Sequence, residues 1–187
     1  MRVIAGSARR LLLKTPEGME TRPTQDRIKE TLFNILQDVV PGRSFLDLYA
    51  GSGGIGIEAL SRDAVKAVFV DSSKKSRDCI VENLKHCHLE DRATVLCQDV
   101  FSAIPFLERE GTFDIIFMDP PYGKELDRDT LAALSKSRIV NEDTLIIVEE
   151  DLHRSFDFLD ETGFYLEREK LYKTNKHAFI RKKAGEI

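Results

Sequence analysis

The apolar residues of this chain occur in short continuous runs that are separated by longer stretches with helical spacing. Five apolar runs predict buried strands, at residues 45–49, 67–70, 94–97, 113–118 and 144–148. The stretches between them predict helices at residues 55–60, 73–89, 100–109 and 126–136. This alternation is typical of an α/β fold, in which helices cover both faces of a mostly parallel sheet.

The C-terminal part of the chain departs from this alternation. Residues 164–171 and 177–181 predict two strands without a long helix between them. Because a parallel connection needs a crossover of roughly a dozen residues or more, we expect these two strands to form an antiparallel hairpin at the edge of the sheet. The predicted sheet then has seven strands.

The N-terminal part has a pattern of its own. Residues 1–14 alternate loosely between apolar and polar side chains, which predicts a small hairpin. Apolar positions at helical spacing follow, and Pro41-Gly42 predicts the end of that helix. We therefore divide the chain into a small hairpin-plus-helix extension at residues 1–41, outside the α/β core, and a main domain at residues 42–187.

The composition excludes several classes of protein. Hydrophobic residues make up 42% and charged residues 32% of the 187 residues, as in folded globular domains. No apolar run approaches the ~20 residues that a membrane helix needs, and the N-terminus lacks the apolar region of a secretory signal. Cys79, Cys87 and Cys97 form no C-x-x-C pair, which argues against a zinc ribbon or a disulfide scaffold. We expect a cytoplasmic protein without a metal site.

The histidines do not change this picture. His86 and His88 flank Cys87 on a predicted helix, where their side chains point about 200° apart and cannot easily share an ion. His153 and His177 have no visible partner in the sequence, so we expect them to be surface or strand residues.

Residues 47–56 carry the first candidate chemistry, in the sequence D-L-Y-A-G-S-G-G-I-G between a strand and a helix. Glycines in such a loop allow a tight turn and the close approach of a ligand to the N-terminus of the helix. The candidate cofactor contacts of this loop are Ala50, Gly51, Ser52, Gly53 and Gly56. Asp71 ends the next strand and can accept hydrogen bonds from two ribose hydroxyls, in NAD or in S-adenosylmethionine.

Two further acidic positions favour S-adenosylmethionine over NAD. Asp47 precedes the glycine loop by four residues, where a carboxylate can meet the ammonium group of the methionine moiety. Gln98 and Asp99 follow the third predicted strand, and Asp99 could accept a hydrogen bond from the adenine amino group or cap the next helix. All of these residues lie at the carboxyl ends of strands, where open α/β sheets bind ligands.

The tetrapeptide Asp119-Pro120-Pro121-Tyr122 follows the fourth predicted strand. Proline cannot donate to a sheet ladder, so the strand must end here. The Asp119 carboxylate and the Pro120 carbonyl can accept the two N–H groups of an exocyclic amine, and Tyr122 can stack on the base for roughly 1–3 kcal/mol. The tetrapeptide therefore predicts methylation of a base amine, with Asp119, Pro120 and Tyr122 as the catalytic residues.

The chain resembles a known family. The glycine loop and D-P-P-Y look like class I S-adenosylmethionine-dependent methyltransferases, which have a Rossmann-like fold. The segments Arg2–Gly6, Arg22–Arg27 and Lys29–Asn34 resemble the RsmD family of 16S rRNA guanine-N2 methyltransferases. The resemblance implies S-adenosylmethionine as cofactor and 16S rRNA, within a small-subunit ribosomal particle, as the partner of a monomeric enzyme.

The uneven charge of the chain fits an RNA partner. Residues 1–14 carry four basic and no acidic residues, and residues 168–183 carry seven basic residues and one acidic residue, although the net charge is −4. Basic ends on an acidic body suggest a local anion-binding surface. We expect contacts with RNA phosphates from Arg9, Arg10, Arg22 and Arg27.

Three alternatives stay open. A D-P-P-Y enzyme could instead methylate adenine N6 or cytosine N4 in RNA or DNA. An NAD-dependent oxidoreductase would explain the glycine loop and Asp71, but it leaves Asp119 and Tyr122 without a role. An RNA-binding module without catalytic activity would keep the basic ends and would not need Asp119.

Overall fold

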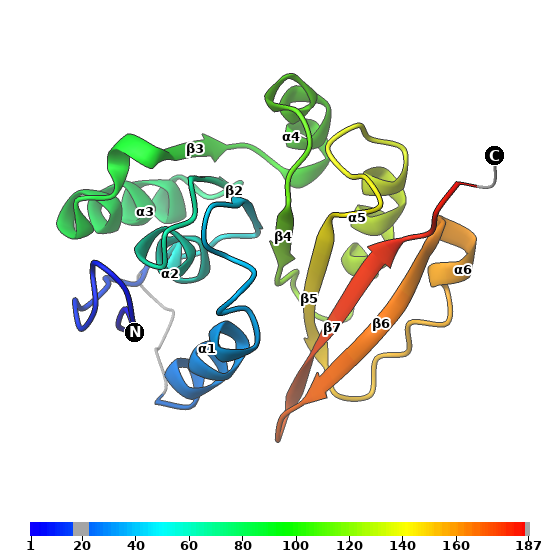
Figure 1. Cartoon of the computed structure of the whole chain (residues 1–187), viewed down its shortest axis with the longest axis horizontal. Helices are drawn as coiled ribbons and strands as arrows, with labels where there is room; N and C mark the ends of the chain where they lie inside the picture. The colour runs from blue at the N-terminus through cyan, green and yellow to red at the C-terminus, as the bar shows by residue number, and fades with distance from the viewer. Residues whose placement is uncertain (17–22, 186–187) are drawn as a thin grey trace.

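The computed structural model describes residues 1–16 and 23–185, and its helices and strands alternate along most of the chain (Figure 1). The helices are α1 (Pro23–Ile35), α2 (Gly54–Ser61), α3 (Lys74–Cys87), α4 (Val100–Leu107), α5 (Leu126–Ser135) and α6 (Leu159–Thr162). The strands are β1 (Ser44–Leu48), β2 (Lys66–Asp71), β3 (Ala93–Cys97), β4 (Ile115–Met118), β5 (Leu145–Asp151), β6 (Phe164–Leu171) and β7 (Asn175–Lys182).

The seven strands form a sheet in the order β3-β2-β1-β4-β5-β7-β6. Strands β1 to β5 pair in parallel, whereas β7 runs antiparallel to both β5 and β6. The predicted seven-stranded, mostly parallel sheet with an antiparallel C-terminal hairpin at its edge is confirmed. The strand order reverses between β1 and β4, and open α/β sheets bind their ligands at such a switch point, beyond the carboxyl ends of the strands.

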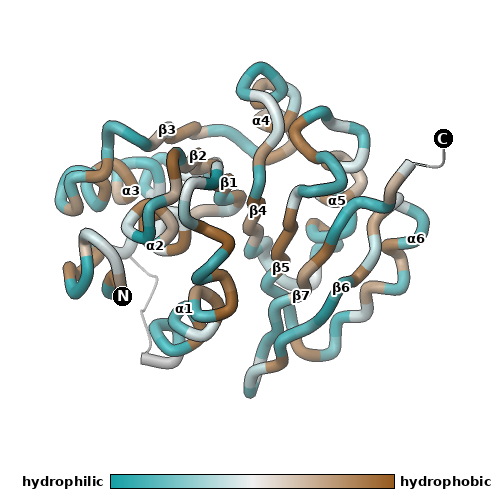
Figure 2. The backbone as a smooth tube through the Cα atoms, viewed as in Figure 1, coloured by the Kyte–Doolittle hydropathy of each residue, from teal (hydrophilic) through white to brown (hydrophobic). Residues whose placement is uncertain are grey.

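Alternate residues of the strands enter two hydrophobic cores, one on each face of the sheet, as the period of a strand requires. In β1, Phe45 joins the core under α1, α2 and α3, and Leu46 joins the core under α4, α5 and α6. In β4, Phe117 and Ile116 divide in the same way. Apolar residues are accordingly concentrated in the strands and on the inner sides of the helices (Figure 2). No helix in the described part of the chain is long and apolar enough to cross a membrane.

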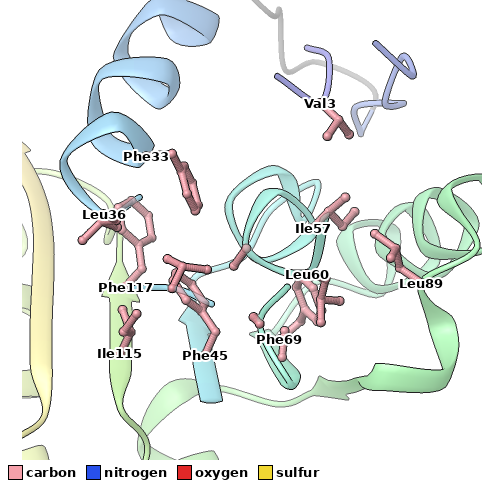
Figure 3. Close-up of a cluster of buried hydrophobic side chains, with 14 of the residues drawn as sticks. Val3, Phe33, Leu36, Phe45, Ile57, Leu60, Phe69, Leu89, Ile115 and Phe117 are labelled. Carbon is pink, nitrogen blue, oxygen red and sulfur yellow. The ribbon is translucent and has the colours of Figure 1, made fainter. Parts of the chain in front are cut away.

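The N-terminal segment packs against the first of these cores. Its predicted hairpin is present, with a bridge between Arg2 and Leu12. We expected residues 1–41 to lie outside the α/β core, but the side chains of Val3, Phe33 and Leu36 are buried in the same cluster as those of α2 and β1 (Figure 3). The hairpin and α1 thus add no strand to the described sheet and still help to close one of its faces.

A buried carboxylate fastens this segment to α2. Glu58 is fully buried and accepts hydrogen bonds from the backbone N–H groups of Ile4, at 2.8 Å, and Ala5, at 3.0 Å. Two cations, Arg62 at 2.8 Å and Lys29 at 3.4 Å, pair with the same carboxylate. Burial lowers the pKa of Lys29, and the charge of Glu58 partly offsets this effect. Loss of one member would leave a buried charge without its partner, which is strongly destabilising.

Helix α1 ends earlier than the sequence pattern predicts. We expected it to continue to Pro41-Gly42, but it ends at Ile35, and the N–H groups of Val39 and Val40 both bond to the carbonyl of Leu36 in the turns that follow. The helical conformation is unfavourable for a residue that precedes a proline, so Val40, which precedes Pro41, is a poor position for the helix to reach. The side chain of Val40 is buried in the core and is only 1% exposed.

Candidate functional site

A hollow of about 580 Å³, which we call the main pocket, opens at the carboxyl ends of β1, β2 and β4. Four aspartates from four different segments line it, namely Asp47, Asp71, Asp99 and Asp119. No lysine, arginine or histidine of the described residues lines this hollow. The sequence pattern placed all four aspartates at strand ends, and the fold brings them to one pocket.

The loop after β1 forms one wall of the main pocket. Gly51 and Gly53 have φ angles of 57° and 77°, in the left-handed region that favours glycine. The N–H of Gly53 donates to the carbonyl of Ala50 at 2.7 Å, which closes the turn just before α2 begins. Ala50, Gly51 and Ser52 line the pocket, as expected of cofactor contacts, whereas Gly53 lies behind the pocket wall.

Gly56 also lies behind this wall, in the first turn of α2. A Cβ atom at this position would overlap the ring of Phe69 on β2. Gly56 therefore allows α2 to pack closely on the sheet, and this packing sets the position of the loop that lines the pocket.

Asp71 joins the loop after β1 to the loop after β2. Its Oδ2 atom accepts the N–H of Gly51 at 2.9 Å, and its Oδ1 atom accepts the N–H of Ser73 at 2.8 Å. A carboxylate oxygen can accept a second hydrogen bond. Asp71 can therefore hold both loops and still bind hydroxyl groups of a ligand in the pocket.

Asp47 lies at the base of the main pocket and is only 1% exposed. It accepts the backbone N–H of Gly56 at 2.9 Å. Burial raises its pKa to about 8, an increase that this hydrogen bond reduces and the charge of Asp71 adds to. A cation that binds beside Asp47 would stabilise its ionised form.

The wall beside Asp99 is apolar. Asp99 caps α4 through a hydrogen bond of 3.0 Å from the N–H of Ser102, and hydrogen bonds from Ser102 lower its pKa. Val100 and Phe101, which follow Asp99 in the chain, line the pocket, as does Leu126 at the start of α5. Such a wall suits a flat heterocycle with a polar edge. Gln98, the other predicted contact of this strand end, does not line the pocket.

The segment Asp119-Pro120-Pro121-Tyr122 borders the other end of the main pocket. Asp119 and Pro121 line the pocket, Pro120 is buried, and Tyr122 is 46% exposed. Asp119 is open to the pocket, but protein surrounds its carboxyl group on the other sides. This burial raises its pKa well above the ordinary value, and the nearby charges of Glu149, Asp47 and Glu150 raise it further.

Sequence reasoning missed a network of hydrogen-bonded side chains beside Asp119. His177 on β7 is fully buried; one ring nitrogen lies 3.0 Å from Glu149, and the other lies 3.0 Å from the hydroxyl of Tyr172. Asn175 donates to the same carboxylate of Glu149. We expected His177 to be a surface or strand residue without a partner; it is a strand residue, but it is buried and paired. The position of Glu149 directly after the predicted strand at residues 144–148 was the available signal.

Three of the four predicted RNA-contacting arginines lie together on the surface. Arg9, Arg10 and Arg27 line a depression of about 380 Å³, together with Arg2, and we call it the basic depression. Arg22, the fourth predicted contact, lies outside the described residues. The fold therefore brings arginines of the hairpin and of α1 to one depression on the surface.

The charge of the main pocket indicates what kind of ligand fits there. A dinucleotide would bring a doubly negative pyrophosphate to a cavity that, among the described residues, is lined by four aspartates and by no basic side chain. S-adenosylmethionine brings an ammonium and a sulfonium, both positive. A cavity of this size is in the usual range for small-molecule sites, and the residues present therefore fit S-adenosylmethionine better than NAD.

The sheet order, the glycine loop and the D-P-P-Y segment beside it define a Rossmann-like fold of the class I methyltransferase type. Comparison with known families agrees with this class. The family model described as "Conserved hypothetical protein 95" matches residues 1–181. This model represents the RsmD family, so the chain belongs to that family.

Individual relatives are similar over most of their length. "Putative rRNA methyltransferase YlbH" of Bacillus subtilis is 40% identical over 152 residues, which cover 81% of this chain and 83% of the relative. "Ribosomal RNA small subunit methyltransferase D" of Escherichia coli is 33% identical over 172 residues, 91% of this chain and 84% of the relative. Among solved structures, "Putative methyltransferase yhhF from Escherichia coli" superposes with a TM-score of 0.82 at 31% identity, covering 99% of both chains.

Proposed function

We propose that the protein transfers a methyl group from S-adenosylmethionine to the exocyclic N2 amine of a guanine in 16S rRNA. The observation that carries this proposal is the position of Asp119, which lines the same pocket as the glycine loop and Asp71. Membership of the RsmD family and the printed names of the relatives support rRNA as the substrate. Such a substrate supports a cytoplasmic location for the protein.

The main pocket would hold the cofactor along its length. All three of Asp47, Asp71 and Asp99 line the pocket, and in the proposed arrangement Asp47 would face the amino-acid end, Asp71 the ribose, and Asp99 with its apolar neighbours the adenine. When bound, S-adenosylmethionine supplies a methyl group on a positively charged sulfur, which makes the departing thioether a good leaving group. The positive charge of the cofactor would relieve the mutual repulsion of the carboxylates that line the pocket.

Asp119 and Pro120 would hold the attacking amine. The lone pair of a base amine is delocalised into the ring, so the amine is a poor nucleophile. The Asp119 carboxylate and the Pro120 carbonyl each accept one N–H, which orients the nitrogen for attack at a distance of about 3–3.5 Å. The nitrogen loses a proton as it gains the methyl group. The positive charge of the cofactor would favour the ionised form of Asp119, and the raised pKa of that carboxylate makes it a stronger base for this proton.

Tyr122 would hold the base itself. Its ring is 46% exposed beside Asp119, and burial together with the neighbouring carboxylates raises the pKa of its hydroxyl. The phenol therefore stays neutral, and the ring offers a stacking surface. The target base must leave its helical stack to reach this position, as other enzymes that modify bases require.

The basic depression would contact the RNA around the target. Its arginines come from the hairpin and from α1, and the hairpin is fastened to α2 by Glu58. α2 begins at the glycine loop, so these phosphate contacts are held in a fixed position relative to the main pocket.

The direct test is to map modified nucleosides in 16S rRNA from cells with and without this protein by mass spectrometry. We expect one N2-methylguanosine to disappear in its absence and to return when the purified protein and S-adenosylmethionine are added to small-subunit particles. Loss of N6-methyladenosine or N4-methylcytidine instead would favour the alternative base amines. An unchanged set of modifications would refute the proposed activity.

A further inference from the structure

The carboxylate of Glu149 lies in the same transverse row of the sheet as Asp119. Met118 is paired with Val148 in the parallel register of β4 and β5, so the next residues, Asp119 and Glu149, lie side by side. Neighbouring strands are about 4.8 Å apart. On its other side Glu149 is paired with His177 of β7. The row therefore continues from the methylation site into the antiparallel edge of the sheet.

The buried network holds Glu149 in one orientation. Tyr172 keeps its proton because burial, with a contribution from Glu149, raises its pKa to about 12. Its hydroxyl can therefore donate to Nδ1 of His177, which leaves the hydrogen on Nε2 for Glu149. Asn175 donates to the second oxygen of the carboxylate at 2.6 Å. A carboxylate with one donor on each oxygen is held in one orientation before any ligand binds.

A small hollow of about 100 Å³, which we call the side pocket, lies in front of this row. Asp119, Glu149 and His177 line it, and Phe117 and Ile55 form apolar parts of its wall. Asp119, Phe117 and Ile55 also line the main pocket, so the two hollows adjoin. A base whose amine is held at Asp119 would therefore present its neighbouring ring atoms to Glu149.

The bases differ in what they present there. In guanine the ring N1–H donor is adjacent to the 2-amino group, so two donors face the same side. In adenine and in cytosine the ring nitrogen beside the amine is an acceptor. Two acceptor oxygens in a row complement the first arrangement and disfavour the second, because the lone pair of the ring nitrogen would face an oxygen lone pair with no hydrogen between them.

From this juxtaposition we propose that Glu149 is a specificity-determining residue, which accepts the N1–H of guanine while Asp119 accepts an N–H of the 2-amino group. The proposal rests on the proposed function and adds the reason for the choice of base. His177, with Tyr172 and Asn175 around it, is a positioning residue that acts through Glu149.

The test changes one hydrogen on the base and one atom on the protein. Once the methylated nucleotide has been mapped, particles are rebuilt with 2-aminopurine at that position, which keeps the 2-amino group and has an acceptor at N1. Single-turnover methylation of both substrates is then measured with the parent protein and with Glu149→Gln. Glu167→Gln is the control, because Glu167 lies on β6 of the same sheet, accepts a hydrogen bond from Arg181 and does not line the side pocket.

We expect the parent protein to methylate 2-aminopurine about 10- to 100-fold more slowly than guanine, the usual effect of one lost charged hydrogen bond. Glu149→Gln should lose a similar factor on guanine and recover on 2-aminopurine, because its amide can donate to N1. The affinity of both variants for S-adenosylhomocysteine and the methylation rate of Glu167→Gln should stay near the parent values. If the parent protein methylates both substrates equally, Glu149 does not read N1. That arm needs no variant, so it decides the matter even if Glu149→Gln fails to fold. Methylation of adenine instead of guanine would refute the proposed function itself.

Discussion

The backbone N–H of Gly56 donates a hydrogen bond of 2.9 Å to Oδ2 of Asp47, which is buried at the base of the main pocket. A single hydrogen bond from one N–H offsets only part of the cost of removing this carboxylate from water. Burial accordingly raises the pKa of Asp47 from 3.8 to about 8. In the ligand-free protein this aspartate lowers stability at neutral pH, and its site becomes negative when a bound cation favours the ionised form.

Asp47→Asn should therefore stabilise the fold increasingly as the pH rises. In the unfolded chain Asp47 ionises near 3.8, whereas in the folded protein it keeps its proton until about 8. The wild-type protein loses stability across that window, and the asparagine variant lacks this loss. In urea unfolding, the stability difference between the two should grow from about pH 5 to about pH 8 by more than ~1.4 kcal/mol, the equivalent of one pKa unit. Asp78→Asn, at an exposed residue of α3, serves as the control. An equal difference at both pH values would contradict the assigned shift.

Asp71→Ala should weaken cofactor binding. The change removes the acceptor for the N–H groups of Gly51 and Ser73 and the proposed partner of the ribose. We expect calorimetry to show at least roughly tenfold lower affinity for S-adenosylhomocysteine, since hydrogen bonds to a charged group are lost, while Asp78→Ala binds as the parent does. Equal affinities of the parent and Asp71→Ala would remove Asp71 from the cofactor site.

The same pocket should reject NAD. In a thermal-shift experiment only a ligand that binds the folded state raises the melting temperature. S-adenosylhomocysteine should do so and NAD should not, because four aspartates and no basic side chain of the described residues line the main pocket. Stabilisation by NAD alone would return the oxidoreductase alternative.

Much of this arrangement was accessible from the sequence because short-range patterns determine it. The strands follow from apolar runs, and Asp47, Asp71, Asp99 and Asp119 follow from the rule that sites form at the carboxyl ends of parallel strands. These residues did meet in one pocket. Gly53 and Gly56, in contrast, fit the glycine motif but do not line the pocket, since the motif does not say which glycine serves packing.

The remaining features depend on long-range register, which a single sequence does not reveal. The pairing of Glu149 with His177 requires the antiparallel register of β5 and β7. The burial of Glu58 depends on a hairpin more than 50 residues away, whose backbone donates to it. Arg9 and Arg27 meet only because α1 packs beside the hairpin.

Removing the charges of Arg9 and Arg10 should weaken RNA binding and reduce its dependence on salt. Both arginines line the basic depression, and their backbone N–H groups, which hold the hairpin, are unaffected by Arg→Gln changes. Each lost phosphate contact should lower the slope of log affinity against log salt by about 0.7–0.9. The control is the pair Arg109→Gln and Arg138→Gln, near the amino end of β4. An unchanged slope for Arg9→Gln with Arg10→Gln would make the depression an ordinary charged surface.

Tyr122 should act through its ring and not through its hydroxyl. Tyr122→Phe should keep most of the activity, whereas Tyr122→Ala should lose roughly 1–3 kcal/mol of base stacking, measured as a weaker apparent affinity for the RNA substrate. Cofactor affinity should stay constant in both variants, because Tyr122 does not line the main pocket. Equal losses in the two variants would point to the hydroxyl instead.

The most direct measurement is single-turnover methyl transfer by Asp119→Ala to small-subunit particles that lack the modification. Asp119 lines the main pocket and is the proposed acceptor for the target amine. We predict that the rate falls at least ~10²-fold, as for other positioned hydrogen-bonding groups, while affinity for S-adenosylhomocysteine changes little. Transfer at the parent rate would mean that the D-P-P-Y segment is only a turn after β4, and it would contradict the proposed mechanism even if the cofactor is correct.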